Sequence, residues 1–354
     1  MMLATYGYMY VYDRVRDFVA GLSPAAICQL FYVFGAVTVL AIAAMPDSVR
    51  RLLTEYGART STSTASPVPA ASSRNRDDND RKRHGTVTGL LVHLIACITS
   101  ASKVPHSWFI HFYILSLSCT IFWAVQFATD GIILESIVKS QSSKTATSMT
   151  IEQVVLIWLL MGLQGARRLY EYLAVLRPSS SRMWVIHWVL GNSFYLCTSV
   201  AVWVDGSSKL QTRPWSLSPV INWRIESLLY SDRSSLHIEI PTFRSILASS
   251  VFLVAWFMQY RCHRHLAGLK KYSLPHEGLF KYLVCPHYTC ECLIYLSMAV
   301  IAAPEGKSCN QTLACAALFV LVNLGVTANG TKQWYREKFG VIVEEQWKMI
   351  PFLF

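Results

Sequence analysis

The sequence predicts an all-α, polytopic membrane helix bundle with about seven transmembrane helices. Apolar residues make up 53% of the chain and charged residues only 15%, and the mean hydropathy is +0.34. A soluble domain carries nearer a quarter of charged residues. The apolar residues are also grouped into blocks close to the length of about 20 residues that crosses a bilayer core.

Seven apolar segments are predicted to be transmembrane helices, and they lie at residues 25–45, 108–128, 151–173, 183–204, 244–260, 279–303 and 311–328. A further apolar stretch, 88–101, is too short to cross the bilayer alone. We expect it to be an interfacial helix before the second span. The alternative is two spans divided at Lys103-Val104-Pro105.

The charge of the loops orients this bundle. With the N-terminus outside the cytosol, the inside segments 46–87, 166–182, 261–278 and 332–354 hold 20 of the Lys and Arg residues. The outside segments hold 9. Cytosolic loops are enriched in Lys and Arg, so the predicted topology has a lumenal N-terminus and a cytosolic C-terminus. Asn310-Gln311-Thr312 then falls in a lumenal loop, as an acceptor sequence for a glycan.

The predicted organisation has six parts. They are a lumenal segment (1–24), the first transmembrane helix (25–45), a disordered basic cytosolic loop (46–87), substrate-side transmembrane helices (88–204), a lumenal loop (205–243) and a C-terminal cofactor-binding region (244–354). Within the cytosolic loop 46–87, residues 57–87 are rich in Ser, Thr, Ala and Pro, a composition that cannot bury a core. The 24 residues before the first apolar run lack the short positive region of a signal peptide, so we expect that run to be retained.

Two functional classes are disfavoured. The net charge of +11 arises from basic residues spread over several membrane-flanking loops, so no nucleic-acid partner is expected. Cys262, His263 and His265, followed by Cys285 and Cys290, suggest a metal site, but their spacings match no zinc pattern and we expect no metal.

Candidate site residues gather at the cytosolic ends of the last three predicted spans. Glu291 lies inside an apolar span, where an ionisable residue is expensive and marks a site. His287 precedes it by four residues and shares its helix face. Basic and aromatic residues around them suit a nucleotide with several phosphates, although the sequence has no Gly-x-Gly-x-x-Gly or P-loop motif.

The motifs of residues 259–354 are similar to the NADPH-binding half of the steroid 5-alpha-reductase family. They run from Pro-x-x-Gly-Leu-Phe-x-Tyr at Pro275, through Cys-Pro-x-Tyr-x-x-Glu at Cys285, to Trp-Tyr-x-x-Lys-Phe at Trp334 and the final Pro-Phe-Leu-Phe. The resemblance implies NADPH as cofactor, with a pocket lined by Gln259, His263, Lys270, Tyr272, His287, Glu291, Lys332 and Tyr335. Gln259, His263, His287 and Lys332 replace the residues usual in steroid-reducing members.

A second group of motifs resembles the polyprenol and polyprenal reductase branch of that family. The first is Val104-Pro105-His106-Ser107-Trp108-Phe109-Ile110-His111-Phe112-Tyr113, and the second is Arg167-Arg168-Leu169-Tyr170-Glu171. Trp108 matches a residue on the nicotinamide side of the family's site. Steroid-reducing members have an acid in place of Phe112 and a tyrosine near Gly165, and both are missing here.

The resemblance implies an endoplasmic reticulum enzyme that reduces the alpha-isoprene double bond of a long polyprenyl lipid in dolichol biosynthesis, in support of protein N-glycosylation. An alpha,beta-unsaturated aldehyde accepts hydride at its beta carbon when a hydrogen-bond donor stabilises the charge that develops on the carbonyl oxygen. We expect His111 and Tyr113 to serve as those donors. We expect Arg167 and Arg168 to be structural or ion-paired, with Glu171 as their partner.

Three other functions remain open at this point. One is a reductase of the same family that acts on a steroid or a trans-enoyl thioester. Another is a transporter or scaffold, although such transporters often contain internal repeats and none is visible here. The third is a membrane methyltransferase with a related C-terminal half.

Overall fold

The computed structural model describes residues 14, 17, 21–46, 50, 103–144, 149–177, 181–207, 242–270 and 273–354. Each of the seven predicted spans coincides with a helix: α2 (Pro24–Ala43), α5 (Ile110–Ala128), α7 (Ile151–Tyr170), α8 (Val185–Ala201), α11 (Phe243–Gly268), α12 (Pro286–Ile301) and α13 (Gln311–Phe339). Three predicted segments lie wholly or almost wholly outside the described residues. They are the loop 57–87, the interfacial helix at 88–101 and the loop 205–243.

Five of the helices in the described part of the chain are long and apolar enough to cross a membrane. These segments are Pro24–Ala43, His106–Ala128, Val185–Gly206, Phe243–Gly268 and Gln311–Phe339. The other two predicted spans differ for visible reasons, because α7 carries Glu152, Arg167 and Arg168 and α12 is only 16 residues long. The predicted class, a multi-pass membrane helix bundle, is confirmed.

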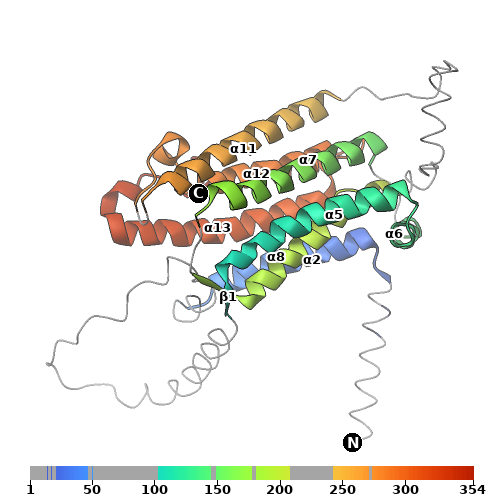
Figure 1. Ribbon diagram of the computed structural model, residues 1–354, viewed down its shortest axis with the longest axis horizontal. Helices are drawn as coiled ribbons and strands as arrows, with labels where there is room; N and C mark the ends of the chain where they lie inside the picture. The colour runs from blue at the N-terminus through green and yellow to red at the C-terminus, as the bar shows by residue number, and fades with distance from the viewer. Residues whose placement is uncertain are drawn as a thin grey trace, which may run out of the picture.

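The long helices run in alternate directions (Figure 1). The starts of α5, α8 and α12 therefore lie at the same end of the bundle as the ends of α7, α11 and α13. A two-stranded antiparallel sheet marks this end, with β1 (Lys103–Pro105) before α5 and β2 (Arg182–Trp184) before α8. Its strands pair like those of a hairpin but are connected through the helices between them. We call this end of the bundle the hairpin end. The loops predicted to be cytosolic leave the bundle here.

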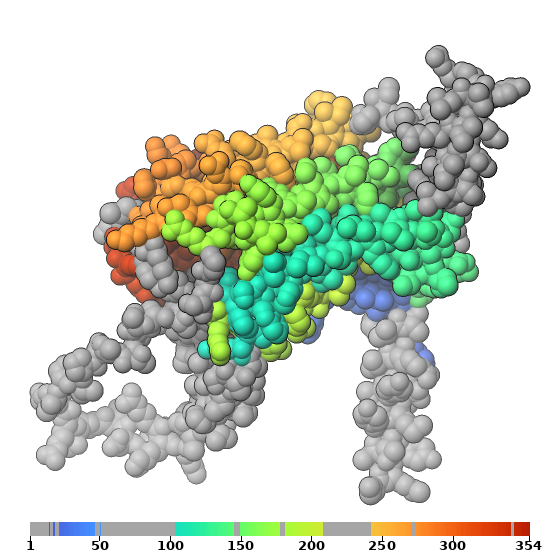
Figure 2. Space-filling view, in the orientation of Figure 1, coloured from blue at the N-terminus to red at the C-terminus, as the bar shows by residue number. Residues whose placement is uncertain are grey.

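Residues on the outer surface of the bundle are apolar. Large exposed side chains project from α2, α5, α7, α8 and α11, among them Phe34, Val37, Ile121, Val125, Leu159, Leu196, Val254 and Phe257. Extended apolar surface of this kind is rare on soluble monomers and fits contact with lipid. Figure 2 shows α11, α7 and α5 as successive bands across one face of the molecule.

The interior packs around aromatic rings at the centre of the bundle. Phe194 of α8 contacts Tyr32, Tyr295 and Phe319, with ring centroids 5.8, 5.6 and 5.4 Å away. Gly35 of α2 makes this packing possible, because a Cβ atom there would lie 2.6 Å from the Phe319 ring. The helices are thus fixed in position by close contact between α2, α8, α12 and α13.

Helix starts are set by local capping. Ser23 caps α2 with Pro24 in the first turn, Thr150 forms a capping box with Gln153 before α7, and Thr242 caps α11. Such caps satisfy backbone N–H groups that have no partner inside the helix. A helix that the sequence did not predict, α6 (Ile132–Ser142), occupies the expected loop between α5 and α7.

Asn310, which the sequence marks as a possible glycan acceptor, is a helix cap in the structure. Asn310 is only 1% exposed: its side chain caps α13 by accepting from the Leu313 N–H (3.0 Å) and donates to Asp205 (3.0 Å). Thr312, the third residue of the acceptor sequence, is fully buried and bonds Gln29. A glycan on Asn310 would require both the cap and the packing to be lost.

The C-terminal segment folds back against the start of α12. The Val284 and Cys285 N–H groups donate to the carbonyls of Trp347 (2.8 Å) and Lys348 (2.9 Å). Lys332 of α13 donates to the carbonyls of Glu344 (2.9 Å) and Gln346 (2.6 Å). The segment after α13 is therefore fixed to the hairpin end of the bundle.

Candidate functional site

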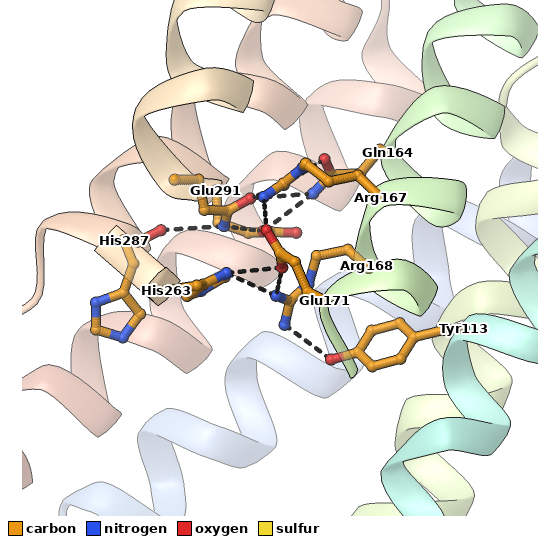
Figure 3. A network of polar contacts seen from close by, with 9 residues as sticks. Tyr113, Gln164, Arg167, Arg168, Glu171, His263, His287 and Glu291 are labelled. Atoms are coloured by element: carbon orange, nitrogen blue, oxygen red, sulfur yellow. Dashed lines mark hydrogen bonds and ion pairs between the residues drawn. The ribbon is translucent and has the colours of Figure 1, made fainter. Parts of the chain in front are cut away.

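Buried polar side chains gather at the hairpin end, between α5, α7, α11 and α12 (Figure 3). Polar and ionised groups inside a membrane bundle are costly unless they are paired, and they mark functional sites. The set is Tyr113, Gln164, Arg167, Arg168, Glu171, Gln259, His263, His287 and Glu291. Two arginines and two glutamates give it balanced formal charge.

Glu171 is the central anion of this network. Its side chain is fully buried, and it accepts from Arg167 on Oε1 and from Arg168 on Oε2. Residues three and four positions apart lie on one helix face, which is why both arginines reach it. Glu171 begins a π-helical turn (Glu171–Val175), in which the Leu176 N–H donates to the Glu171 carbonyl. Such turns are rare and frequently lie at functional sites.

Two glutamine amides connect Arg167 to the second anion, Glu291. The Gln259 and Gln164 Oε1 atoms both accept from Arg167 Nη2, the latter at 2.7 Å. Their Nε2 groups both donate to Glu291 Oε2, that of Gln164 at 3.3 Å. Gln259 also donates to the His287 carbonyl at 3.1 Å. α7, α11 and α12 are thus linked through side-chain amides.

His263 of α11 lies between the anion and a cation. Its Nδ1 is 2.8 Å from Glu171 Oε2 and 2.8 Å from Arg168 Nη1. A protonated Nδ1 donates to Glu171, and an unprotonated Nδ1 accepts from Arg168. The His263 ring meets that of His287 edge-on, with centroids 5.6 Å apart.

The Tyr113 hydroxyl is held as a hydrogen-bond donor. Arg168 Nη2 donates to it over 2.8 Å, and the Arg168 guanidinium also lies over the Tyr113 ring, 5.0 Å from its centroid. An arginine has no acceptor atom. Tyr113 is buried, yet no residue in the described part of the chain accepts its proton. Buried tyrosine hydroxyls normally find a partner, so this O–H is available for a ligand.

His111 is held as a donor by the same logic. The Trp188 indole N–H donates to His111 Nδ1 over 3.1 Å, and an indole nitrogen donates only. A neutral His111 therefore carries its proton on Nε2. Trp108 completes an aromatic group here, with ring centroids 5.4 Å from His111 and 5.2 Å from Trp188.

The two expected donors lie on different sides of α5. Tyr113 contacts Arg168 of α7, and through it the buried network, whereas His111 contacts Trp188 of α8. Among the described residues, hydrogen bonds and ion pairs therefore connect Tyr113, but not His111, to Gln259, His263 and Glu291.

The remaining expected cofactor residues are spread over the hairpin end. Lys270 is exposed just after α11, and Tyr272 lies outside the described residues. Lys332 donates to backbone carbonyls of the C-terminal segment. Tyr335 packs among apolar residues beneath that segment, near Trp334 and Phe339. The structure brings Gln259, His263, His287 and Glu291 together and leaves Lys270, Lys332 and Tyr335 apart from them.

The donors at this end suit a phosphorylated nucleotide. Exposed cations surround it, namely Arg261, Arg264, Lys270, Lys281, Arg336 and Lys338. His265 adds a buried Nε2 atom that has no hydrogen-bond partner among the described residues. An imidazole nitrogen can donate to or accept from a ligand, depending on its protonation.

Arg167 and Arg168 were expected to be structural or to pair with Glu171, and the ion pairs confirm this prediction. These arginines were not placed in the site from the sequence alone. Their contacts with Gln259 and Tyr113 were missed. The available signal was the spacing of Gln164, Arg167, Arg168 and Glu171, at positions i, i+3, i+4 and i+7. That spacing puts four polar groups on one face of an apolar helix.

Comparison with known proteins identifies the C-terminal region. Residues 221–354 match the family described as 3-oxo-5-alpha-steroid 4-dehydrogenase. This part of the chain is therefore similar to that family. The matched part includes α11, α12 and α13, and with them Gln259, His263, His287 and Glu291.

Similarity to polyprenal reductases extends beyond this domain. The chain is 32% identical to the polyprenal reductase of Saccharomyces cerevisiae, over 56% of this chain and 64% of the yeast protein, which is just under two thirds of its length. It is 24% identical to polyprenal reductase 2 of Oryza sativa subsp. japonica, over 93% of this chain and 98% of the rice protein. Polyprenal reductase 1 of Arabidopsis thaliana is 26% identical over 67% of this chain and 77% of its own length.

Proposed function

We propose that this protein reduces the alpha-isoprene double bond of polyprenal, with NADPH as the hydride source. The observation that carries the proposal is the Tyr113 hydroxyl, a buried donor with a spare proton beside the part of the chain that matches the 3-oxo-5-alpha-steroid 4-dehydrogenase family. The names of the yeast, rice and Arabidopsis relatives indicate the substrate class.

The chain's residues supply the electrophilic part of this reaction. The Tyr113 O–H donates to the carbonyl oxygen of the unsaturated aldehyde and stabilises the negative charge that forms there as the beta carbon accepts hydride. The His111 Nε2–H is a second donor, nearer the hairpin and the Trp108 ring. A proton from water then reaches the alpha carbon. A bare allylic alcohol offers no electron-poor carbon, so the aldehyde is the acceptor.

The cofactor site is proposed for the same end of the bundle. NADPH supplies the hydride when it is bound. The candidates to hold it are Trp108, Gln259, His263, Lys270, Tyr272, His287, Glu291, Lys332 and Tyr335, with the exposed cations near its phosphates. Lys332 has a structural alternative, since it already binds two backbone carbonyls.

The cellular setting follows from the substrate. A long polyprenyl lipid resides in the bilayer, and the apolar outer surface of the bundle matches that environment. We assign the protein to the endoplasmic reticulum membrane, in dolichol biosynthesis for protein N-glycosylation. The hairpin end faces the cytosol in this proposal, as the distribution of Lys and Arg favours.

The test offers three acceptors to the purified full-length chain with NADPH: polyprenal, polyprenol and a 3-oxo-4-ene steroid. NADPH oxidation is followed by absorbance and the lipid product by mass spectrometry. We expect oxidation with polyprenal and none with the steroid. Phe112 and Gly165, which pack against Gly191 and Ser116, put no acid or hydroxyl where steroid-reducing members have them. Turnover of the steroid alone would refute the assignment.

Variants then separate the two donors. Tyr113→Phe should lower kcat by about 10² to 10⁴-fold, the range for loss of a positioned acid–base or oxyanion donor. Tyr172→Phe is the matched control, because Tyr172 lies beside Tyr113 but its hydroxyl donates to the Ser107 carbonyl. His111→Gln is compared with His106→Gln, whose ring stacks on Phe109. Undiminished turnover by Tyr113→Phe would remove Tyr113 from the mechanism.

A further inference from the structure

Arg168 contacts three side chains of the network, whereas a structural ion pair requires contact with the carboxylate alone. One guanidinium nitrogen, Nη1, reaches Glu171 and lies 2.8 Å from His263 Nδ1. The other, Nη2, donates to Tyr113, and the guanidinium plane covers the Tyr113 ring. Arg167 binds the same carboxylate, but its other hydrogen bonds go to Gln164 and Gln259 and not to Tyr113. The two neighbouring arginines therefore have different tasks.

The contact with Tyr113 fixes the direction of the hydroxyl proton. A phenolic oxygen carries one proton and accepts in its remaining directions. With Arg168 donating to it, the Tyr113 proton points away from Arg168. A donor that itself receives a hydrogen bond is also polarised and becomes a stronger donor. Arg168 thus prepares Tyr113 for an acceptor outside the network.

Glu171 determines where Arg168 lies. An arginine side chain has several rotatable bonds, and ordering it costs up to about 2 kcal/mol of side-chain entropy. The buried Glu171 carboxylate offsets this cost by holding Nη1, which leaves Nη2 aimed at Tyr113. Glu171 is also the first residue of the π-helical turn that comes directly after α7.

We propose that Arg168 is a positioning residue of the reductase, which acts through Tyr113, and that Glu171 is its anchor. The inference rests on the proposed function. Hydride adds to the beta carbon, the electrons of the double bond shift to the carbonyl oxygen, and the Tyr113 O–H, aimed by Arg168, stabilises the charge there. Water then protonates the alpha carbon, so the aldehyde gains one hydride and one proton.

The experiment compares Arg168→Lys with Arg244→Lys in the full-length protein with polyprenal and NADPH. Arg244 is the matched structural arginine, since it donates to the carbonyls of Ala303 and Lys307 at the opposite end of the bundle. A lysine at position 168 keeps the charge but cannot bind Glu171 and Tyr113 together in the planar geometry of arginine. We expect Arg168→Lys to lower kcat about 10-fold to 100-fold, as for loss of a charged hydrogen bond, with KM nearly unchanged. Arg244→Lys should keep its kcat.

A double-mutant cycle with Tyr113→Phe tests the route of the effect. If Arg168 acts through the Tyr113 oxygen, Arg168→Lys slows the Tyr113→Phe enzyme less than twofold. The thermal midpoint of each variant, measured without NADPH, shows whether folding has changed. A kcat of Arg168→Lys close to that of the wild type overturns the inference, and so does an equal loss in both backgrounds. If Tyr113→Phe has no measurable turnover, the comparison with Arg244→Lys decides.

Failure of the proposed function gives a different result. In that case the wild-type protein does not oxidise NADPH with polyprenal at all, and the variants are not compared. A wild type that turns over, together with an Arg168→Lys variant that matches it, leaves the function intact and removes only the role of Arg168.

Discussion

Replacing Glu171 by glutamine should destabilise the protein far more than replacing an exposed glutamate. The Glu171 side chain is fully buried and receives bonds from Arg167, Arg168 and His263. The substitution keeps the shape but removes the carboxylate that pairs with the buried Arg167 and the partly buried Arg168. The remaining anion, Glu291, is linked to Arg167 through the amides of Gln164 and Gln259. Removing one partner of a buried ion pair costs about 3–5 kcal/mol.

Glu135→Gln is the control for this measurement. Glu135 forms an ion pair with Lys139 at the same four-residue spacing, but the two side chains are 53% and 64% exposed. An exposed pair contributes about 0–1 kcal/mol. Both variants are unfolded in detergent micelles by titration with a denaturing detergent, and the free energies of unfolding are compared. A Glu171→Gln protein as stable as Glu135→Gln would refute the assignment of Glu171 as the central anion of the network.

Three further predictions concern packing and the protein's ends. Glycosidase treatment of protein expressed in eukaryotic cells should cause no mobility shift attributable to Asn310, and Asn310→Ala should lower stability by about 1 kcal/mol through loss of the α13 cap. Gly35→Ala should cost about 1–3 kcal/mol in a denaturation titration because its Cβ meets the Phe319 ring, while Gly268→Ala, with nothing within 4 Å, should be nearly neutral. Lys332→Met should make the C-terminal segment more susceptible to limited proteolysis, because two bonds to its carbonyls are lost; unchanged cleavage would show that Lys332 does not hold the segment.

The helices could be predicted from the sequence because burial in lipid imposes a simple rule. A span must be apolar over about 20 residues, and seven segments meet or approach that length. The same rule could not find α6, which has only 11 residues and lies at the bundle's other end. It also could not find the π-helical turn after α7. A π-helical turn differs from an α-helical turn in its hydrogen bonding and not in its apolar content, which is all that the rule reads.

The candidate site was predictable as a set of residues but not as a geometry. Polar groups in apolar spans, such as Glu291, stand out in any hydropathy reading. The direction of a hydrogen bond depends on the neighbour across a helix interface. Trp188 is 77 positions from His111, and Arg168 is 55 from Tyr113. Nothing local in the sequence shows that each of these donors determines where its partner's proton points.

Asn310 shows the limit of a motif that is read without its environment. The acceptor sequence and the predicted lumenal position were both compatible with a glycan. The same side chain is an equally good helix cap, and an asparagine directly before a helix is strongly favoured in that position. Burial against Asp205 decides between the two uses.

The spacing of charges in α7 has a consequence for how the protein enters the membrane during synthesis. α7 is made before α11 and α12, so His263, Gln259 and Glu291 do not yet exist when the translocation machinery receives it. Arg167 and Arg168 nevertheless have a counterion on their own helix, because Glu171 follows them by four and three residues. The nascent segment therefore carries one excess charge instead of two at this end. This pairing lowers the cost of burying Arg167 and Arg168 before the partner helices are made.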